Sequence, residues 1–187
     1  MKAQRYLTAI IFLIVCSVCS VSAQKPSTPT PDVVYVPTSQ TVVDAMLKLA
    51  KVTKDDLVFD LGCGDGRIVI AAAKQFGAKG IGIEIDRELV KRAEENAKQE
   101  QVTDKVKFIE EDIFKTDFRR ATVVMLYLSP SVNLRLRPRL IKQLKPGTRI
   151  VSHDFDLGDW KPDQTIKVEN ATLHFWTVPA KKPKFKK

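Results

Sequence analysis

The spacing of apolar residues alternates along the chain between short continuous runs and helical repeats, and this alternation predicts strands and helices in turn. Short apolar runs bounded by turn residues are typical of buried strands, and such runs occupy 57–61, 80–85, 106–109, 122–128 and 148–152. Between the runs, apolar residues recur three and four positions apart, which predicts helices. One predicted helix follows a cap at Thr38 or Ser39, and the others span 66–76, 86–97 and 132–144, the last interrupted at Pro138.

The alternation ends after the fifth predicted strand. Residues 165–168 and 172–178 are strand-like, and Glu169 and Asn170 between them predict an antiparallel hairpin. The repeated strand–helix units before this hairpin imply a parallel sheet with helices on both faces. We therefore expect an α/β domain at 33–179, with a mostly parallel seven-stranded sheet that ends in an antiparallel hairpin.

Both ends of the chain differ from this domain. Lys2 and Arg5 precede an apolar run at 7–21, and small residues near Ala23 offer a cleavage site. This layout predicts a signal peptide at 1–23, with an uncleaved membrane anchor as the second interpretation. Residues 24–32 are rich in Pro, Ser and Thr and predict a flexible linker, and the lysines of 180–187 predict a disordered basic tail.

Charge and metal-binding residue types restrict the possible partners. The 187 residues have a formal net charge of +9, much of it at the two ends. The basic tail could therefore contact anionic surfaces weakly. No basic motif interleaved with aromatic residues occurs, which argues against specific nucleic-acid recognition. The sequence has two histidines, His153 and His174, and no cluster with metal-ligand spacing, so we expect no metal.

A glycine-rich turn joins the strand at 57–61 to the next helix, with the sequence Asp-Leu-Gly-Cys-Gly-Asp-Gly at 60–66. Glycine allows a positive φ and a close approach of ligand to backbone. Turns of this kind bind nucleotide-like ligands at the carboxyl edge of a parallel sheet. An acid here would repel a pyrophosphate but suits the cationic amino and sulfonium groups of S-adenosylmethionine (SAM). The turn therefore favours SAM over a dinucleotide and makes Asp60, Gly62, Cys63 and Gly64 candidate contacts.

Further acids follow the next two strands. Glu84 ends the second strand, where a carboxylate can accept hydrogen bonds from ribose hydroxyls. An acid at this position supports nucleoside binding but does not distinguish SAM from a dinucleotide. Asp86 is expected to cap the following helix. After the third strand, Asp112 could accept a hydrogen bond from an adenine amino group, and Ile113 could cover the ring.

Together these residues resemble class I SAM-dependent methyltransferases over about 33–179. Four flanking segments narrow the resemblance: Tyr-Val-Pro-Thr at 35–38, Tyr-Leu-Ser-Pro at 127–130, Lys-Pro-Gly-Thr at 145–148, and Val-Ser-His-Asp-Phe at 151–155 with Trp160 soon after. They are similar to the mitochondrial protein-lysine methyltransferases that modify the ATP synthase c-subunit and the adenine nucleotide translocase, and to bacterial relatives of that family. The resemblance implies a Rossmann-like fold, SAM as cofactor and a protein lysine as a plausible acceptor. It also suggests that Tyr35, Pro37 and Thr38 fold over the cofactor.

The chemistry of a lysine acceptor indicates which side chains could orient it. A lysine must lose its proton before it accepts a methyl group, and its reference pKa is about 10.4. Burial near a cation would favour that loss. The candidates to orient the amine are Tyr127, His153 and Asp154, which end the fourth and fifth predicted strands.

Two alternatives to protein-lysine methylation stay open. One is a small-molecule methyltransferase. The other is an exported, non-catalytic binding protein with a Rossmann-like shell. The second alternative follows from the signal-like start, which predicts a periplasmic, exported or membrane-anchored protein although SAM is made in the cytoplasm.

Overall fold

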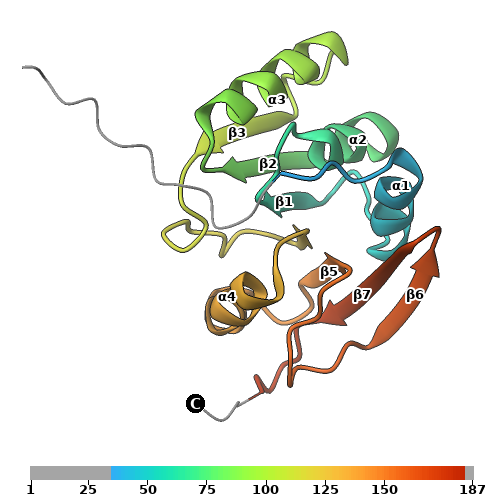
Figure 1. Ribbon diagram of the computed structural model, residues 1–187, viewed down its shortest axis with the longest axis vertical. Coiled ribbons are helices and arrows are strands. Elements are labelled where there is room, and N and C mark those ends of the chain that lie inside the picture. The colour runs from blue at the N-terminus through green and yellow to red at the C-terminus, as the bar shows by residue number, and fades with distance from the viewer. Residues whose placement is uncertain (1–34, 184–187) are drawn as a thin grey trace, which may run out of the picture.

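Seven strands form one sheet in the part of the chain that the structure, a computed structural model, describes, residues 35–183 (Figure 1). The predicted signal peptide or anchor, the linker and the last four residues of the tail lie outside the described residues. The elements in chain order are α1 (Gln40–Leu49), β1 (Leu57–Leu61), α2 (Arg67–Phe76), β2 (Lys79–Glu84), α3 (Arg87–Gln99), β3 (Val106–Glu110), β4 (Val123–Leu126), α4 (Pro130–Gln143), β5 (Arg149–His153), β6 (Gln164–Val168) and β7 (Ala171–Thr177).

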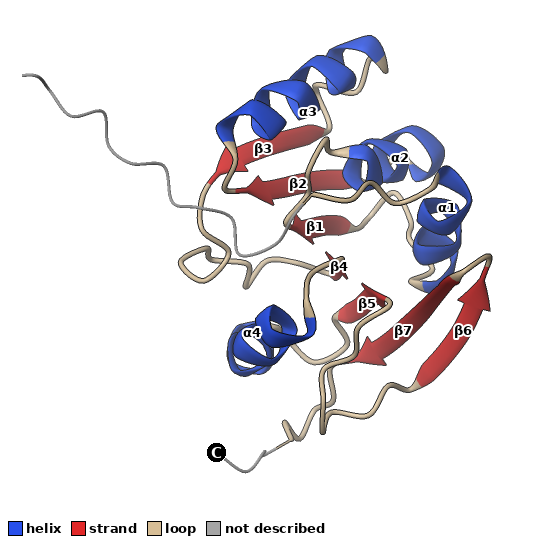
Figure 2. Ribbon diagram, viewed as in Figure 1, coloured by secondary structure: helices blue, strands red, loops and turns tan. Residues whose placement is uncertain are grey.

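The strand order is β3-β2-β1-β4-β5-β7-β6. The first five strands run parallel, and β7 lies antiparallel to both β5 and β6. Because β6 and β7 follow each other directly, they form the expected hairpin at the end of the sheet (Figure 2). The predicted seven-stranded, mostly parallel sheet is therefore confirmed.

Helices cover both faces of the sheet, because its central strands are apolar on both sides. Alternate residues of β4 belong to opposite cores: Val123 and Met125 pack on the side of α1, α2 and α3. Val124 and Leu126 pack on the side of α4. A strand that is buried on both faces needs helices on both, as Figure 2 shows for β4.

Short polar residues begin three of the helices. The side chains of Ser39, Asp86 and Ser129 accept hydrogen bonds from backbone N–H groups in the first turns of α1, α3 and α4. The predicted cap at Ser39 and the predicted role of Asp86 are confirmed. Each cap also fixes the point at which the chain leaves the sheet edge for a helix.

Helix α4 differs from the prediction in two ways. It begins at Pro130, directly after its Ser129 cap, and it runs through Pro138 without the expected interruption. A proline removes one N–H from the helix ladder. Pro138 and Leu134 both lie on the exposed side of the helix, so water can satisfy the carbonyl that the missing N–H leaves free. The fourth strand is also shorter than predicted, and Tyr127 and Leu128 lie beyond its end.

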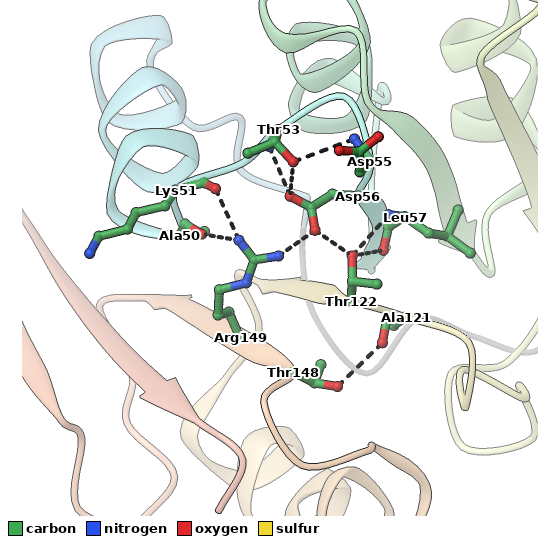
Figure 3. Close-up of polar contacts among 10 residues, drawn as sticks. All are labelled: Ala50, Lys51, Thr53, Asp55, Asp56, Leu57, Ala121, Thr122, Thr148 and Arg149. Atoms are coloured by element: carbon green, nitrogen blue, oxygen red, sulfur yellow. Dashed lines mark hydrogen bonds and ion pairs between the residues drawn. The ribbon is translucent and has the colours of Figure 1, made fainter.

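A buried polar network joins the amino ends of the strands, at the edge opposite the loops that follow β1, β2 and β4 (Figure 3). The carboxylate of Asp56 accepts hydrogen bonds from Thr53 N at 2.8 Å and Thr122 Oγ1 at 2.7 Å, and it pairs with Arg149. Arg149 also donates to the backbone oxygens of Ala50 and Lys51 at 2.7 and 3.0 Å. The network therefore ties the end of α1 to β1 and β5. Among residues 35–183, no helix has the length and apolar character that crossing a membrane requires.

Candidate active site

A cavity of about 750 Å³ opens at the carboxyl edge of the sheet, where β1, β2, β3 and β4 end. Its walls come from five places: residues 35–38, the glycine turn, the end of β2, the loop after β3, and the segment from Tyr127 into α4. Phe155 adds a side chain from the loop after β5. The fold thus brings predicted contacts from distant parts of the chain together in one cavity.

The glycine turn is fixed to the neighbouring strand by its own backbone. The N–H groups of Gly62 and Cys63 both donate to Ile83 O, at 2.8 and 2.9 Å. Gly64 has φ +53°, and a Cβ built on it would lie 2.3 Å from Cε2 of Tyr35. Only glycine leaves room for the Tyr35 ring at this point. Gly64 therefore lies beneath Tyr35 and does not line the cavity, unlike the other predicted cofactor contacts.

Asp60 is the carboxyl group in the cavity whose pKa is most strongly perturbed upward. Its side chain is 2% exposed, and Oδ2 has no hydrogen-bond partner among the described residues. Burial, and next the nearby Glu84 and Asp65, raise the pKa of Asp60 to about 8. A buried carboxyl without a partner is costly to ionise unless a cation or a donor approaches it. The geometry thus suits a ligand that brings a positive group to Asp60.

Glu84 is held in one orientation by three backbone N–H groups. Oε2 accepts from Gly64 N at 2.9 Å, and Oε1 accepts from Ile85 N and Asp86 N at 2.8 and 3.1 Å. A carboxylate has about four acceptor sites, so one remains for a hydroxyl in the cavity. Asp86 lines the cavity as well as capping α3.

The loop after β3 forms a local turn that presents its apolar side chains to the cavity. Asp112 Oδ1 accepts from Phe114 N at 2.8 Å, and Asp112 O accepts from Lys115 N and Thr116 N at 2.8 and 3.1 Å. Ile113 and Phe114 line the cavity beside Asp112. An acceptor next to apolar side chains suits a flat heteroaromatic ring.

A guanidinium clamp holds residues 35–38 over the glycine turn. Arg67 donates to both oxygens of Asp65, at 2.9 Å from Nε and 2.6 Å from Nη2. Its Nη1 donates to Thr38 O at 2.6 Å, and Nη2 lies 3.5 Å from the Tyr35 hydroxyl. Burial raises the pKa of Asp65, but the Arg67 contacts outweigh it and leave that pKa lowered. Neither clamp residue was among the predicted site residues, although Asp65 lies inside the glycine turn and Arg67 directly follows it.

The three candidates to orient an acceptor lie together, but one of them reaches the cavity. Tyr127 lines the wall, whereas His153 and Asp154 lie behind it. The His153 ring is 6% exposed and stacks on Tyr127, with centroids 3.8 Å apart and planes inclined by 23°. The backbone of Asp154 is left-handed, with φ +61°, and its Oδ1 accepts from Thr172 N on β7 at 2.9 Å.

A polar chain links His153 to the clamped segment. Thr38 Oγ1 lies 3.2 Å from His153 Nδ1, and Asp154 Oδ2 lies 3.5 Å from Nε2. A carboxylate beside Nε2 favours a proton on that nitrogen, so Nδ1 accepts from the Thr38 hydroxyl. Burial lowers the pKa of His153, and Asp154 opposes this in part. The ring is therefore neutral near pH 7 and joins residue 38 to Tyr127.

Ser129, Arg135 and Phe155 also line the cavity, although they were not among the predicted site residues. The Arg135 Cζ atom is 4.2 Å from the Phe114 ring centroid, within the range of a cation–π contact. Ser129 and Phe155 belong to the Tyr-Leu-Ser-Pro and Val-Ser-His-Asp-Phe segments, whereas no motif marks Arg135, which lies on α4. Among residues 35–183, no group of three or more His, Cys, Asp or Glu side chains could hold a metal ion.

The sequence of this chain is similar to those of known methyltransferases. The sequence model of the ANTKMT methyltransferase domain matches residues 60–164. A protein-lysine N-methyltransferase of Saccharolobus islandicus is 47% identical over 77% of this chain and 90% of its own length. The ATP synthase c-subunit lysine N-methyltransferase of Xenopus laevis is 34% identical over 69% of this chain, which is 56% of that longer protein.

A solved structure matches the fold and the sequence together. The chain is similar to an RNA methyltransferase from Salinibacter ruber, crystallised with S-adenosyl-L-homocysteine, at 55% identity and a TM-score of 0.79. The match covers 80% of this chain and 98% of that chain. The two similar prokaryotic proteins are thus described with different acceptors.

Proposed function

Because the chain belongs to the ANTKMT methyltransferase family, we propose that it transfers a methyl group from SAM to the side-chain amine of a protein lysine. The observation that carries this conclusion is the 47% identity to the Saccharolobus protein-lysine N-methyltransferase, which extends over 90% of that protein. The match includes the whole catalytic domain and not just the glycine turn, so it bears on the acceptor as well as on the fold.

The cavity fits SAM on its own chemistry. Asp60 offers an unpartnered carboxyl to the cationic end of the molecule, and Glu84 offers an acceptor to ribose hydroxyls. Asp112 and Ile113 supply the acceptor and apolar cover that an adenine requires. When bound, SAM supplies a methyl group already activated by its sulfonium.

The same residues disfavour a dinucleotide. Five carboxyl groups line the cavity, and Arg67 is fully engaged with one of them and with Thr38 O. A pyrophosphate would therefore meet several acids with no unengaged cation beside the glycine turn. Like charges in a partly buried site repel strongly, since the effective dielectric is low. The lining acids are Asp60, Asp65, Glu84, Asp86 and Asp112.

The acceptor enters between Tyr127 and Phe155, where aromatic walls remove water from the amine. Removing water favours the neutral amine, which has the lone pair that the reaction needs. Burial, and next Asp154, raise the pKa of Tyr127, so its hydroxyl keeps its proton at neutral pH. Its oxygen can still accept a hydrogen bond from the amine and aim the lone pair. Tyr127 thus orients the amine and does not remove its proton.

His153 is a positioning residue in this scheme, because its ring lies behind Tyr127. We expect His153→Ala to lower kcat by about tenfold, since a shifted Tyr127 disturbs the alignment of the amine. His153→Phe keeps an aromatic ring against Tyr127 and should restore most of kcat, which a hydrogen-bonding role for His153 would not allow. His174→Ala on β7 is the matched control and should leave kcat unchanged.

The decisive experiment follows the methyl group. Full-length protein is incubated with methyl-labelled SAM and an extract of the cells that express it. The labelled macromolecules are then digested with protease or with ribonuclease. Protease-sensitive label on lysines supports the proposal. The Asp60→Asn variant should transfer much less label at a SAM concentration near the wild-type Kd, whereas Asp104→Asn, at an exposed carboxylate, should behave as the wild type.

RNA is the second candidate acceptor, because the 55% identical Salinibacter protein is described as an RNA methyltransferase. Label that ribonuclease removes and protease leaves would assign RNA and overturn lysine methylation. Label that passes a size filter untreated and that chromatography separates from SAM would assign a small molecule. No transfer at all, with SAM still bound, would favour a non-catalytic binding protein.

We also propose that residues 1–23 direct the chain to a membrane, as a signal peptide or an anchor. The support is the basic start followed by an apolar run at 7–21. Protease protection in fractionated cells tests this proposal and locates the domain relative to the SAM pool. A domain recovered wholly in the soluble cytoplasmic fraction, with residues 1–23 intact, would contradict it.

A further inference from the structure

Charge is distributed unevenly in the described chain. Residues 113–150, which contain β4 and α4, hold nine lysines and arginines and a single acid, Asp117. In the remainder of residues 35–183 the acids outnumber the bases. Arg149 is engaged with Asp56 at the far edge of the sheet, but most of the others are exposed. One side of the molecule is therefore strongly basic.

The exposed bases line a second, smaller hollow. A groove of about 290 Å³ lies between the second half of α4 and the segment before β4. Arg139 holds the two walls together by donating to Thr116 O at 2.8 Å. We call the side chains of Lys115, Arg119, Arg135, Arg139 and Lys142 the basic face.

The one acid in this groove is already neutralised. Asp117 accepts from Arg119, with Nη2 and Oδ2 2.6 Å apart, and the hydrogen bonds from Arg119 lower the pKa of Asp117 to about 2. Lys182 adds a further cation beside the groove, because its Nζ donates to Lys142 O at 3.1 Å. The groove therefore keeps a net positive charge across the whole neutral range.

Arg135 joins the basic face to the active-site cavity. It lies on the exposed side of α4, and it also lines the cavity near Phe114. A protein chain that lies along α4 can therefore extend from the basic face to the cavity. The exposed Leu134, 45% accessible, lies next to Arg135 on the same side of the helix and can pack against that chain.

We propose that the basic face docks an acidic segment of the substrate protein, so that the enzyme prefers lysines flanked by Asp or Glu. This inference rests on the proposed lysine methylation. Complementary charge speeds encounter and fixes the register of the bound chain.

An acidic protein segment fits this face better than single-stranded RNA. Proteins that bind single-stranded RNA stack bases on exposed aromatic rings. Within residues 113–150 the ring of Phe118 is fully buried, Arg135 covers Phe114, and Tyr127 stacks on His153 in the cavity wall.

The test compares two lysine peptides that differ only in having Glu or Gln on either side of the lysine. At low salt the full-length enzyme should show a kcat/KM about tenfold higher for the Glu peptide than for the Gln peptide. Salt at roughly 0.5 M should remove most of this difference, because salt screens exposed charges. Lys142→Gln, at a residue of the basic face that does not line the cavity, should cut the preference to about threefold without changing kcat/KM for the Gln peptide. Arg92→Gln, an exposed arginine on α3, is the matched control and should keep the full preference.

Binding of a fluorescent Glu peptide, read by anisotropy, gives a measure that does not depend on turnover. Equal kcat/KM for the two peptides, with both methylated, would overturn the docking inference and leave lysine methylation standing. Failure to methylate either peptide, with labelled RNA instead, would overturn both. Loss of the preference in Arg92→Gln as in Lys142→Gln would show a general charge effect and also contradict the role of the face. Lys142-dependent binding of RNA or anionic vesicles without any peptide preference would assign the face to that partner instead.

Discussion

At the scale of single residues, the cavity depends on one carboxyl that the fold leaves without a partner. Asp60 is buried against Glu84 and Asp65, and its raised pKa of about 8 keeps it largely protonated at pH 7 in the absence of ligand. A cationic ligand favours the ionised form, so binding and proton release are linked. The domain thus holds a site that becomes charged when SAM arrives.

We therefore predict that SAM binding at pH 7 releases close to one proton, which calorimetry in buffers of different ionisation enthalpy measures. Asp60→Asn should abolish this release and weaken binding by about ten- to a hundredfold, since a hydrogen bond to a charged group contributes roughly 1.5–3 kcal/mol. The exposed Asp104→Asn serves as control. Proton release that persists in the Asp60 variant would assign it to another group.

The same shift affects the stability of the ligand-free protein. The folded state holds a proton on Asp60 that the unfolded chain releases near pH 4, so this contribution to stability is complete below about pH 4 and is lost as the pH rises through about 8. Asp60→Asn should remove that loss and raise the melting temperature at pH 8 by several degrees. A variant that melts below the wild type at pH 8 would contradict the assigned pKa direction.

At the scale of elements, the hydrophobic period placed each strand and helix of residues 35–183, because most of them are buried on one or both faces, but it misjudged the bounds of α4 and β4. The period could not place contacts that depend on how elements meet. Arg67 begins α2 and reaches residue 38, and Arg135 and Phe155 reach the cavity from α4 and the loop after β5. His153 ends β5 and Asp154 follows it, yet neither lines the cavity, because the His153 ring packs against Tyr127 and Asp154 accepts a hydrogen bond from Thr172 N on β7. Sequence position gives the edge of the sheet but not which side chain lies in front.

Arg67 makes the segment at 35–38 an element in its own right, since that segment has no regular structure of its own. We predict that Arg67→Lys raises the KM for SAM by about fivefold to twentyfold and speeds cofactor release, with a smaller change in kcat. Lysine keeps the charge but cannot bind Asp65 through a fork and Thr38 O at the same time. Rapid filtration of labelled cofactor measures the release rate, and the exposed Arg92→Lys is the control. An unchanged release rate would mean that the clamp does not hold the segment over the cofactor.

At the scale of the whole molecule, the two edges of the sheet have separate roles. The carboxyl edge carries the cavity, where the buried and unpartnered Asp60 reduces the stability of the ligand-free protein as the pH rises above about 4. The amino edge carries the Asp56–Arg149 network, which joins α1, β1 and β5 (Figure 3). Because the network is remote from the cavity, its loss should change stability without changing SAM affinity.

The Asp56 side chain is 7% exposed, and the balance of its contacts sets the sign of its pH dependence. Burial alone would raise the pKa of Asp56, but hydrogen bonds from Thr122, Thr53 and Arg149 together outweigh it and lower that pKa. The stabilisation is therefore present above about pH 4, the pKa range of an unfolded aspartate, and is lost as the pH falls through the lower folded pKa.

Asp56→Asn leaves the Arg149 guanidinium without its anion and should cost about 2–4 kcal/mol, lowering the melting temperature at pH 7 by roughly 5–15 °C. Adding Arg149→Met should recover much of the loss, because no unpaired charge then remains, and SAM affinity should stay at the wild-type value in both variants. Equal melting temperatures for the wild type and Asp56→Asn at pH 7 would show that the network does not stabilise the fold.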